Sequence, residues 1–381
     1  MTVISGARIV TPDGVLTDGW LQTEGRAIAR LGTGEPPEPP GRELRGAWVV
    51  PGFVDIHVHG GGRASYVPGD QDQALTAAAL HRQHGTTTTM ASLVTATPDS
   101  LAVAVSELAE LVEDGVLAGI HLEGPFLSVK RCGAHDPALL IDPEPDVVRM
   151  LLDAGRGAIN MVTLAAELPH STGAVARLAA EGVIAAIGHT DASYDETRSA
   201  IDTGATVATH LFNAMRPVHH REPGPVPALL EDERVTVELI CDGVHLHPAV
   251  VRMAVAAAGA DRVVLVTDAM DAAGAGDGDY VLGDLAVRVV DGVARLADGD
   301  AIAGSTLTMD RAFRFAVEAG VSVPDAVRMS STNPARLLGL AGRVGELRSG
   351  LDADVVVLDE GLELQAVLAK GQWVDLAKAP R

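Results

Sequence analysis

The sequence predicts an α/β protein, a (β/α)8 TIM-type barrel with a small β-sandwich domain formed by both ends of the chain. Two observations support this prediction. The middle of the chain contains eight near-continuous apolar runs that alternate with helical patterns, and eight β–α repeats close a barrel. Both ends instead carry short strand patterns separated by turn residues. A doubly wound open sheet explains the alternation equally well, but it leaves the number of strands unexplained.

The two ends of the chain share one pattern. Residues 1–50 alternate short apolar runs with turn signals such as Pro12-Asp13-Gly14, and the proline-rich stretch at 35–40 cannot lie inside a helix. After residue 343, short apolar runs with Gly and Asp turns return, which is typical of strands. We therefore expect residues 1–50 plus 344–381 to form the small β-sandwich domain and residues 51–343 to form the catalytic barrel.

The apolar runs of the middle region predict the barrel strands. They contain few polar residues except near their carboxyl ends, as strands buried on both faces require. The expected strands lie within residues 50–59, 86–94, 117–124, 158–167, 183–190, 205–212, 235–246 and 262–270.

Helical patterns lie between these runs. Residues 70–85, 100–115 and 247–259 each repeat apolar residues at spacings of three and four and end in glycine, which predicts amphipathic helices. Asp70 stands where an N-terminal cap is expected.

Composition narrows the class of protein. Aromatic residues make up only 3% of the chain, so Ala, Val, Leu and Ile must build the core. A formal net charge of −22 argues against binding to nucleic acids or anionic membranes. An anionic small molecule would need a locally basic pocket. We expect neither a secretion signal nor a membrane span, because no basic segment followed by an apolar one opens the sequence and no apolar stretch is long enough to cross a bilayer. Two cysteines, Cys132 and Cys241, fit a reducing cytoplasm.

Polar side chains with metal-binding chemistry stand near the carboxyl ends of these runs. Such strand ends converge on the face of a barrel that carries the active site. His57 and His59 point to the same side of their strand, because strand side chains alternate. In chain order, the polar residues near the strand ends are His57, His59, Glu123, His189, His210, His245 and Asp268.

Imidazole and carboxylate groups together suit zinc and similar divalent ions. The six strand-end residues other than His245 could therefore act as metal ligands, and together they predict a site for one or two ions. A divalent ion provides hydroxide near neutral pH and polarises a carbonyl group. Asp268 is placed to take a proton from water and return it to a leaving amine, and His245 to hydrogen-bond a developing oxyanion.

These positions resemble the amidohydrolase superfamily. More specifically, the chain resembles N-acetylglucosamine-6-phosphate deacetylases, and the resemblance covers essentially its whole length. The motifs that carry it are HLEGPF (121–126), GAH (133–135), GHT (188–190), HLFNAM (210–215), REPG (221–224), DGVH (242–245), VTDAM (266–270) and AGSTL (303–307).

The resemblance implies a role for each matching residue. Glu123, His189 and His210 match the principal metal ligands, and His57 and His59 with Asp268 match a second metal position that Glu123 bridges. Asp268 also matches the catalytic acid and base. The residues that match substrate contacts are His135, Asn213, Ala214, Arg221, His245 and Leu307, of which Asn213, Ala214 and Arg221 form the phosphate site.

The implied activity is hydrolysis of N-acetylglucosamine 6-phosphate to glucosamine 6-phosphate and acetate by a cytoplasmic, zinc-dependent homodimer. In the family, Arg221 would come from the neighbouring subunit. Two other functions stay open at this point. Cyclic-amide hydrolases and deaminases share the barrel, but many of them use a carboxylated lysine where this chain has Glu123. A non-catalytic relative would be expected to lose ligands or the catalytic aspartate, and all of these residues are present here.

Overall fold

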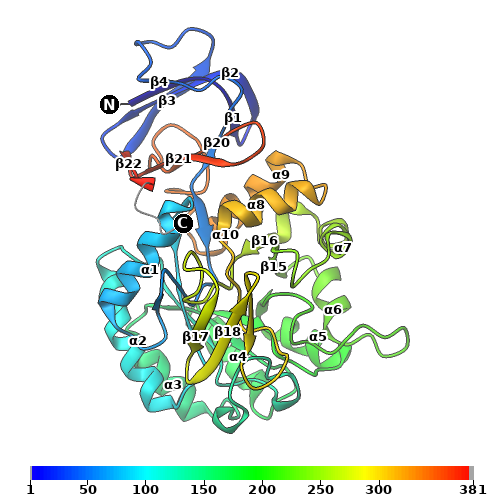
Figure 1. Cartoon of the computed structure of the whole chain (residues 1–381). Coiled ribbons are helices and arrows are strands. Elements are labelled where there is room, and N and C mark those ends of the chain that lie inside the picture. The colour runs from blue at the N-terminus through cyan, green and yellow to red at the C-terminus, as the bar shows by residue number, and fades with distance from the viewer. Residues whose placement is uncertain (1, 377–381) are drawn as a thin grey trace.

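The structure of the protein is a computed structural model that describes residues 2–376. Met1 and residues 377–381, which end the segment assigned to the small domain, lie outside the described residues. Figure 1 shows a sheet of terminal strands standing on one end of a barrel surrounded by helices. The predicted fold class is confirmed.

Parallel strands form the barrel in chain order. β6 pairs with β9, and the other strands form one continuous parallel sheet from β10 to β16. Beyond the strand ends, the His57 carbonyl accepts a hydrogen bond from the Asp268 backbone (2.8 Å), which joins the first strand to the last. The strands are β6 (Phe53–Asp55), β9 (Thr86–Thr89), β10 (Ala91–Val94), β11 (Ile120–Glu123), β12 (Ile159–Leu164), β13 (Ile184–Ile187), β14 (Ala205–Ala208), β15 (Thr236–Ile240) and β16 (Val263–Val266).

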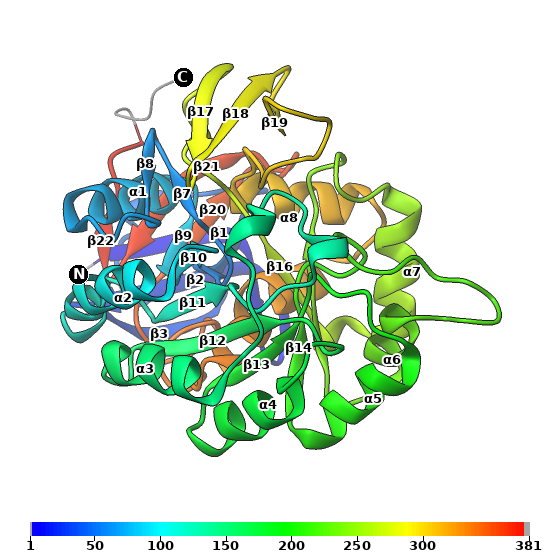
Figure 2. The same ribbon diagram turned by 90° about the horizontal axis from the view of Figure 1, so that it is seen from below.

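Helices surround these strands (Figure 2). They are α1 (Gln71–Gln83), α2 (Pro98–Glu113), α3 (Pro145–Gly155), α4 (Ser171–Ala180), α5 (Tyr194–Thr203), α6 (Pro225–Glu231), α7 (Pro248–Ala258), α8 (Met309–Glu318), α9 (Val323–Val327) and α10 (Asn333–Leu337). Short helical turns are η1 (Val129–Arg131), η2 (Pro137–Leu139), η3 (Ala260–Arg262) and the π-helical η4 (Arg328–Thr332).

Local chemistry explains where these helices begin. The Asp70 side chain accepts a hydrogen bond from the Gln73 backbone N–H and caps α1, as predicted. At the start of α5, Ser193 and Glu196 form a reciprocal capping box. Within residues 2–376, none of the helices has the length and apolar content that crossing a membrane requires.

Strands from both ends of the chain form a single eight-stranded sheet. It is continuous because β5 pairs with N-terminal β1 on one side and with C-terminal β20 on the other. The sheet has an apolar core of its own that includes Leu21 and Val357. Its strands are β1 (Thr2–Thr11), β2 (Gly14–Glu24), β3 (Ala27–Thr33), β4 (Arg42–Glu43), β5 (Trp48–Pro51), β20 (Val355–Leu358), β21 (Leu364–Ala369) and β22 (Gln372–Trp373).

The terminal sheet packs directly on the barrel. Val10, Val356 and Leu358 of the sheet belong to the same buried cluster as Phe53 and Phe313 of the barrel. The division of the chain near residues 50 and 344 therefore stays a prediction, because packing continues across it.

A small antiparallel sheet was not expected from the sequence. It follows the eighth barrel strand and consists of β17 (Gly278–Leu282), β18 (Leu285–Val290) and β19 (Val293–Leu296). Two further short strands, β7 (Gly60–Gly61) and β8 (Ala64–Ser65), pair with each other after β6. Figure 2 shows β17–β19 standing at the edge of the barrel.

Candidate active site

Three of the predicted ligands share one backbone arrangement. His189, His210 and Asp268 each lie two residues after the last residue of a barrel strand. Each has a positive φ, of 45°, 27° and 50° respectively. A left-handed backbone is costly for residues other than glycine and is concentrated at functional sites. This turn brings the three side chains together at the carboxyl end of the barrel.

The other predicted ligands come from the first and third strands. His57 and His59 follow β6, and Glu123 is the last residue of β11. All three side chains are buried. The structure therefore brings all six predicted ligands to one place.

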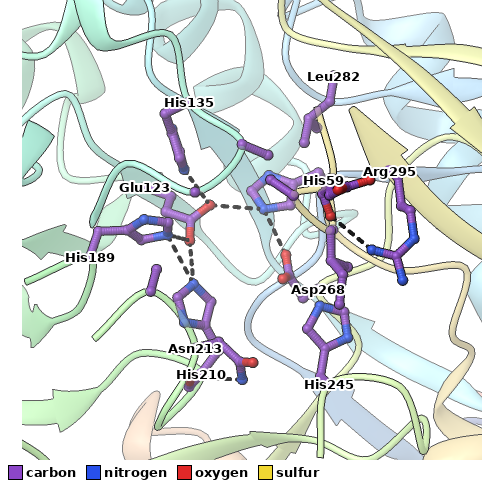
Figure 3. A pocket seen from close by; sticks show the side chains of 17 residues that line it. His59, Glu123, His135, His189, His210, Asn213, His245, Asp268, Leu282 and Arg295 are labelled. Carbon is purple, nitrogen blue, oxygen red and sulfur yellow. Dashed lines mark hydrogen bonds and ion pairs between the residues drawn. The ribbon is translucent and has the colours of Figure 1, made fainter. Parts of the chain in front are cut away.

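Glu123 lies at the centre of this cluster (Figure 3). One of its oxygens, Oε1, lies 2.8 Å from His210 Nε2 and 3.1 Å from His189 Nε2. The other, Oε2, lies 3.2 Å from His59 Nε2. Asp268 Oδ1 lies 3.1 Å from His59 Nε2 and 3.5 Å from His57 Nε2. Glu123 thus lies between two groups of ligands, as a bridging carboxylate would.

The hydrogen-bond partners of the histidine ring nitrogens show whether a metal ion would fit this cluster. His57 Nδ1 faces the Glu238 carboxylate, and the Nδ1 atoms of His59 and His189 face backbone carbonyl oxygens. Each Nδ1 therefore carries a proton and leaves Nε2 directed into the cluster. His57 Nε2 and His59 Nε2 are 3.2 Å apart, as close as a hydrogen bond. A proton or a metal ion must separate such a pair, and these nitrogen and carboxylate donors suit a divalent ion.

Electrostatics of the cluster support the same conclusion. Burial alone lowers the pKa of His59, but Asp268 and Glu123 outweigh it and raise that pKa to about 9. Burial alone raises the pKa of Asp268, but His57 and His59 outweigh it and lower that pKa to about 2. The carboxylates are thus ionised and attract positive charge, which a divalent cation supplies without protonating the imidazoles.

Two buried carboxylates behind the ligands were missed in the sequence. Glu238 Oε2 accepts from His57 Nδ1 (3.1 Å) and from the His210 backbone N–H (3.0 Å). Asp55 accepts from the backbone of His57 and from the hydroxyl of Thr267. Such partners fix the orientation of metal-binding imidazoles. A charged residue within the apolar run of β15 was the available signal for Glu238.

A pocket of about 370 Å³ opens above the cluster. Every predicted metal ligand except His57 lines it, and His57 lies behind them with none of its surface exposed. Two further predicted residues, His135 and His245, also line the pocket (Figure 3).

The surroundings of His135 and His245 shift the pKa values of these two histidines in opposite directions. His245 Nδ1 lies 2.7 Å from the Asp242 carboxylate. Burial opposes protonation of His245, but Asp242 outweighs it and raises the pKa of His245. Burial lowers the pKa of His135 to about 4, and its Nδ1 accepts from the Thr95 backbone N–H (3.3 Å). A neutral His135 therefore presents its Nε2–H toward Glu123 and the pocket.

The predicted phosphate-binding residues are only partly brought together. Asn213 and Ala214 line the pocket, and the backbone at Ala214 is left-handed, with a φ of 49°. Arg221 is exposed and does not line the pocket, because the loop between β14 and α6 that carries it extends away from the barrel (Figure 2).

Leu307 also differs from its expected place. Its side chain is 2% exposed and packs in the main core, so it does not reach the pocket. Ile302 and Gly304, a few residues earlier, line the pocket instead. The unexpected sheet contributes Leu282 and Arg295 to the same wall, where Arg295 Nη1 donates to the Asp300 carbonyl (2.8 Å; Figure 3).

The cysteines take no direct part in this site. Cys241 is buried and its pKa is raised by burial, so it is a core side chain as expected. Cys132 is half-buried next to Gly133, which lines the pocket.

Comparisons with known proteins agree with this geometry. A sequence profile of the amidohydrolase family matches residues 48–378. An N-acetyl-D-glucosamine-6-phosphate deacetylase from Mycobacterium smegmatis, solved as an Asp-to-Ala mutant in complex with N-acetyl-D-glucosamine-6-phosphate, is 50% identical with a TM-score of 0.95. That alignment covers 98% of this chain and 99% of the other.

Two curated relatives align over nearly their whole length. An N-acetylgalactosamine-6-phosphate deacetylase from Escherichia coli O157:H7 is 36% identical and covers 97% of this chain and 98% of the relative. An N-acetylglucosamine-6-phosphate deacetylase from Bacillus subtilis is 33% identical, and that alignment covers 99% of this chain and 98% of the relative. The chain belongs to the amidohydrolase family and, within it, to the N-acetylglucosamine-6-phosphate deacetylases.

Proposed function

We propose that this protein hydrolyses the acetamide of N-acetyl-D-glucosamine 6-phosphate to D-glucosamine 6-phosphate and acetate, in amino-sugar catabolism or cell-wall recycling. One observation carries the proposal. A single pocket joins a buried cluster of metal-binding residues, an aspartate beside them and the turn at Asn213 and Ala214. This combination supports hydrolysis of an amide in a small molecule whose phosphate group would bind at that turn.

The cluster would hold one or two divalent ions, and zinc suits its donors best. Glu123, His189 and His210 would hold one position, and His57, His59 and Asp268 the other, with Glu123 shared. When bound, such an ion polarises the amide carbonyl and lowers the pKa of water.

The chain's own residues move the proton and position the amide. Asp268, ionised at neutral pH, accepts a proton from the attacking water and donates it to the amine nitrogen as the C–N bond breaks. His245, held by Asp242, donates a hydrogen bond to the carbonyl oxygen as negative charge develops. The neutral His135 lies on the other side of Glu123 and adds a second N–H donor.

Substrate phosphate would bind at the turn after β14. The Asn213 side chain and the left-handed backbone at Ala214 supply donors to its oxygens. Arg221 is on an exposed loop that extends away from its own pocket. We therefore propose a homodimer in which Arg221 completes the phosphate site of the neighbouring subunit by binding two phosphate oxygens.

The decisive experiment is an acetate-release assay with zinc-loaded protein. N-acetylglucosamine 6-phosphate should react rapidly, and unphosphorylated N-acetylglucosamine should react at least about a hundredfold less efficiently if the phosphate contacts contribute roughly 3 kcal/mol. Removal of metal by a chelator should abolish turnover, and added zinc should restore it. No release from either sugar by metal-loaded protein would contradict the proposed substrate.

A second substrate has support from one relative. The Escherichia coli protein named for N-acetylgalactosamine 6-phosphate aligns over 97% of this chain. The same assay should therefore include that epimer. If its kcat/KM exceeds that of N-acetylglucosamine 6-phosphate, the reaction stays the same but the physiological sugar is the galactose epimer.

A further inference from the structure

A second pocket lies at the opposite end of the barrel from the metal-binding cluster. It has a volume of about 470 Å³, and we call it the basal pocket. Arg82 in the last turn of α1 and Thr87 near the start of β9 form its barrel side. Turns of the terminal sheet form the other side, which carries Arg26, Lys370 and Trp373.

Close backbone contacts hold the two turns of the sheet together. The Ala353 backbone N–H donates to the Arg26 carbonyl (2.7 Å), and the Gly371 N–H donates to the Ala353 carbonyl (2.9 Å). Gly371 has a φ of 77°, and a Cβ atom there would lie 2.0 Å from the Gly25 carbonyl oxygen. Only glycine fits at this contact, which keeps the backbones of Arg26 and Lys370 near each other.

Elsewhere in the described part of this protein, neighbouring cations share a carboxylate, whereas the cations of the basal pocket do not. Lys130 and Arg131 both pair with Asp191, and Arg198 and Arg234 both pair with Asp232.

Asp375 apart, no carboxylate of residues 2–376 lies within ion-pair distance of Arg26, Arg82 or Lys370. Asp354 acts on Lys370 electrostatically, but it accepts from the backbone N–H of Lys370 (2.6 Å). The Lys370 ammonium instead donates to the Gly115 carbonyl (3.3 Å).

The electrostatics of these cations also favour an anion in the basal pocket. Burial and then the like charge of Arg26 lower the pKa of Lys370, so the two cations act on each other without neutralisation. Thr87 also lines the pocket, but its hydroxyl is buried against Gly52 and is not exposed to the pocket.

We infer that the basal pocket binds a small phosphate, either inorganic phosphate or a phosphate monoester. Arg26, Arg82 and Lys370 offer three positive charges to a dianion. The Trp373 side chain lines the same pocket and gives the organic part of a monoester an apolar wall. Thr87 lies near the amino end of its strand, whereas the metal cluster lies at the carboxyl ends, so this site is separate from the active site.

Tryptophan fluorescence of the full chain tests this inference, because Trp373 reports on the basal pocket. Titration with inorganic phosphate and with glucose 6-phosphate, which has no acetamide, should give a saturable change with a Kd on the order of 1 mM. The change should be lost in Trp373→Phe. It should weaken at least about tenfold in the double variant Arg82→Gln/Lys370→Gln. Tighter binding of glucose 6-phosphate would identify a monoester site, and equal binding a site for the phosphoryl group alone.

The controls separate specific binding from charge screening and from misfolding. Arg149→Gln removes a positive charge from the exposed Arg149–Asp146 pair and should titrate like wild type. Acetate release should be unchanged in the double variant, which shows that it is folded, and Arg26→Gln on an exposed turn is the alternative variant. An identical response to sodium chloride at matched ionic strength would overturn the inference. A wild-type titration by the folded double variant would do the same.

Discussion

The terminal sheet and the carboxyl end of the barrel are both well buried, but they bury different kinds of side chain. The sheet's own core consists of apolar residues such as Ile9, Leu21 and Val357, all with no exposed surface. The barrel end buries carboxylates and imidazoles, among them Glu123 and Glu238. Apolar burial stabilises the fold by itself, whereas buried charges need partners. The terminal sheet therefore mainly stabilises the fold. The barrel end buries charged groups that are costly to the fold but are needed for the reaction.

The largest expected effect tests the chemical side of this comparison. Asp268→Asn should lower kcat by roughly 10²–10⁴-fold, because the proton acceptor is lost, while bound zinc is retained. Acetate release and metal content would be measured together. Asp279→Asn, which removes an exposed carboxylate paired with Arg288, is the control. Full activity in Asp268→Asn would remove the assigned proton transfer.

The next effect tests the stability side. Leu21→Ala should lower the free energy of unfolding by about 2–5 kcal/mol, because it leaves a cavity in a fully buried core. Its kcat/KM at 25 °C should stay at the wild-type value. Thermal unfolding measures the first quantity, and Leu75→Ala, where the leucine is 43% exposed, should change it little. A matching loss of kcat/KM in folded Leu21→Ala would show that the two regions are not separable.

Glu238→Gln should weaken metal binding without removing a predicted ligand. Glutamine keeps the shape of Glu238 but loses the charge that faces His57 Nδ1. Zinc affinity should fall about 10–100-fold, as measured by competition with a chelating dye. Glu233→Gln changes an exposed residue of the preceding turn and should not alter it. Unchanged zinc affinity would make Glu238 a structural carboxylate only.

The smallest effect concerns the exposed loop. Arg221→Ala should raise KM for the phosphorylated sugar roughly tenfold with little change in kcat, because a phosphate contact is lost before chemistry. Mixed dimers give the stronger test. Arg221→Ala and Asp268→Asn subunits, each impaired alone, should recover low KM and turnover together, because one mixed pocket has both residues. Failure to recover, with dimers present, would place Arg221 outside the partner's pocket.

The sequence predicted the parts of the fold that repeat. Near-continuous apolar runs predicted the eight strand positions, and the convergence of strand ends predicted that His57, His59, Glu123, His189, His210 and Asp268 would lie together, as they do. The small sheet was missed because its strands follow the eighth barrel strand, where the repeat of strands and helices that guided the prediction has ended. The alternating burial of β17 and β18 is itself a strand signal. Glu238 was missed because one polar residue in an apolar run does not reveal which side chain it faces.

The resemblance, rather than the residues themselves, assigned the substrate contacts, and there the outcome was mixed. His135, Asn213, Ala214 and His245 line the pocket. Leu307 does not, because it follows the segment that reaches the pocket and its side chain completes the core. Backbone direction at such a turn depends on tertiary packing that neither spacing nor composition encodes.

The left-handed backbone at His189, His210 and Asp268 has an evolutionary consequence. Asparagine and glycine adopt this conformation more readily than histidine does. A lineage freed from catalysis would therefore gain conformational stability by replacing these ligands, one at a time, with asparagine or glycine.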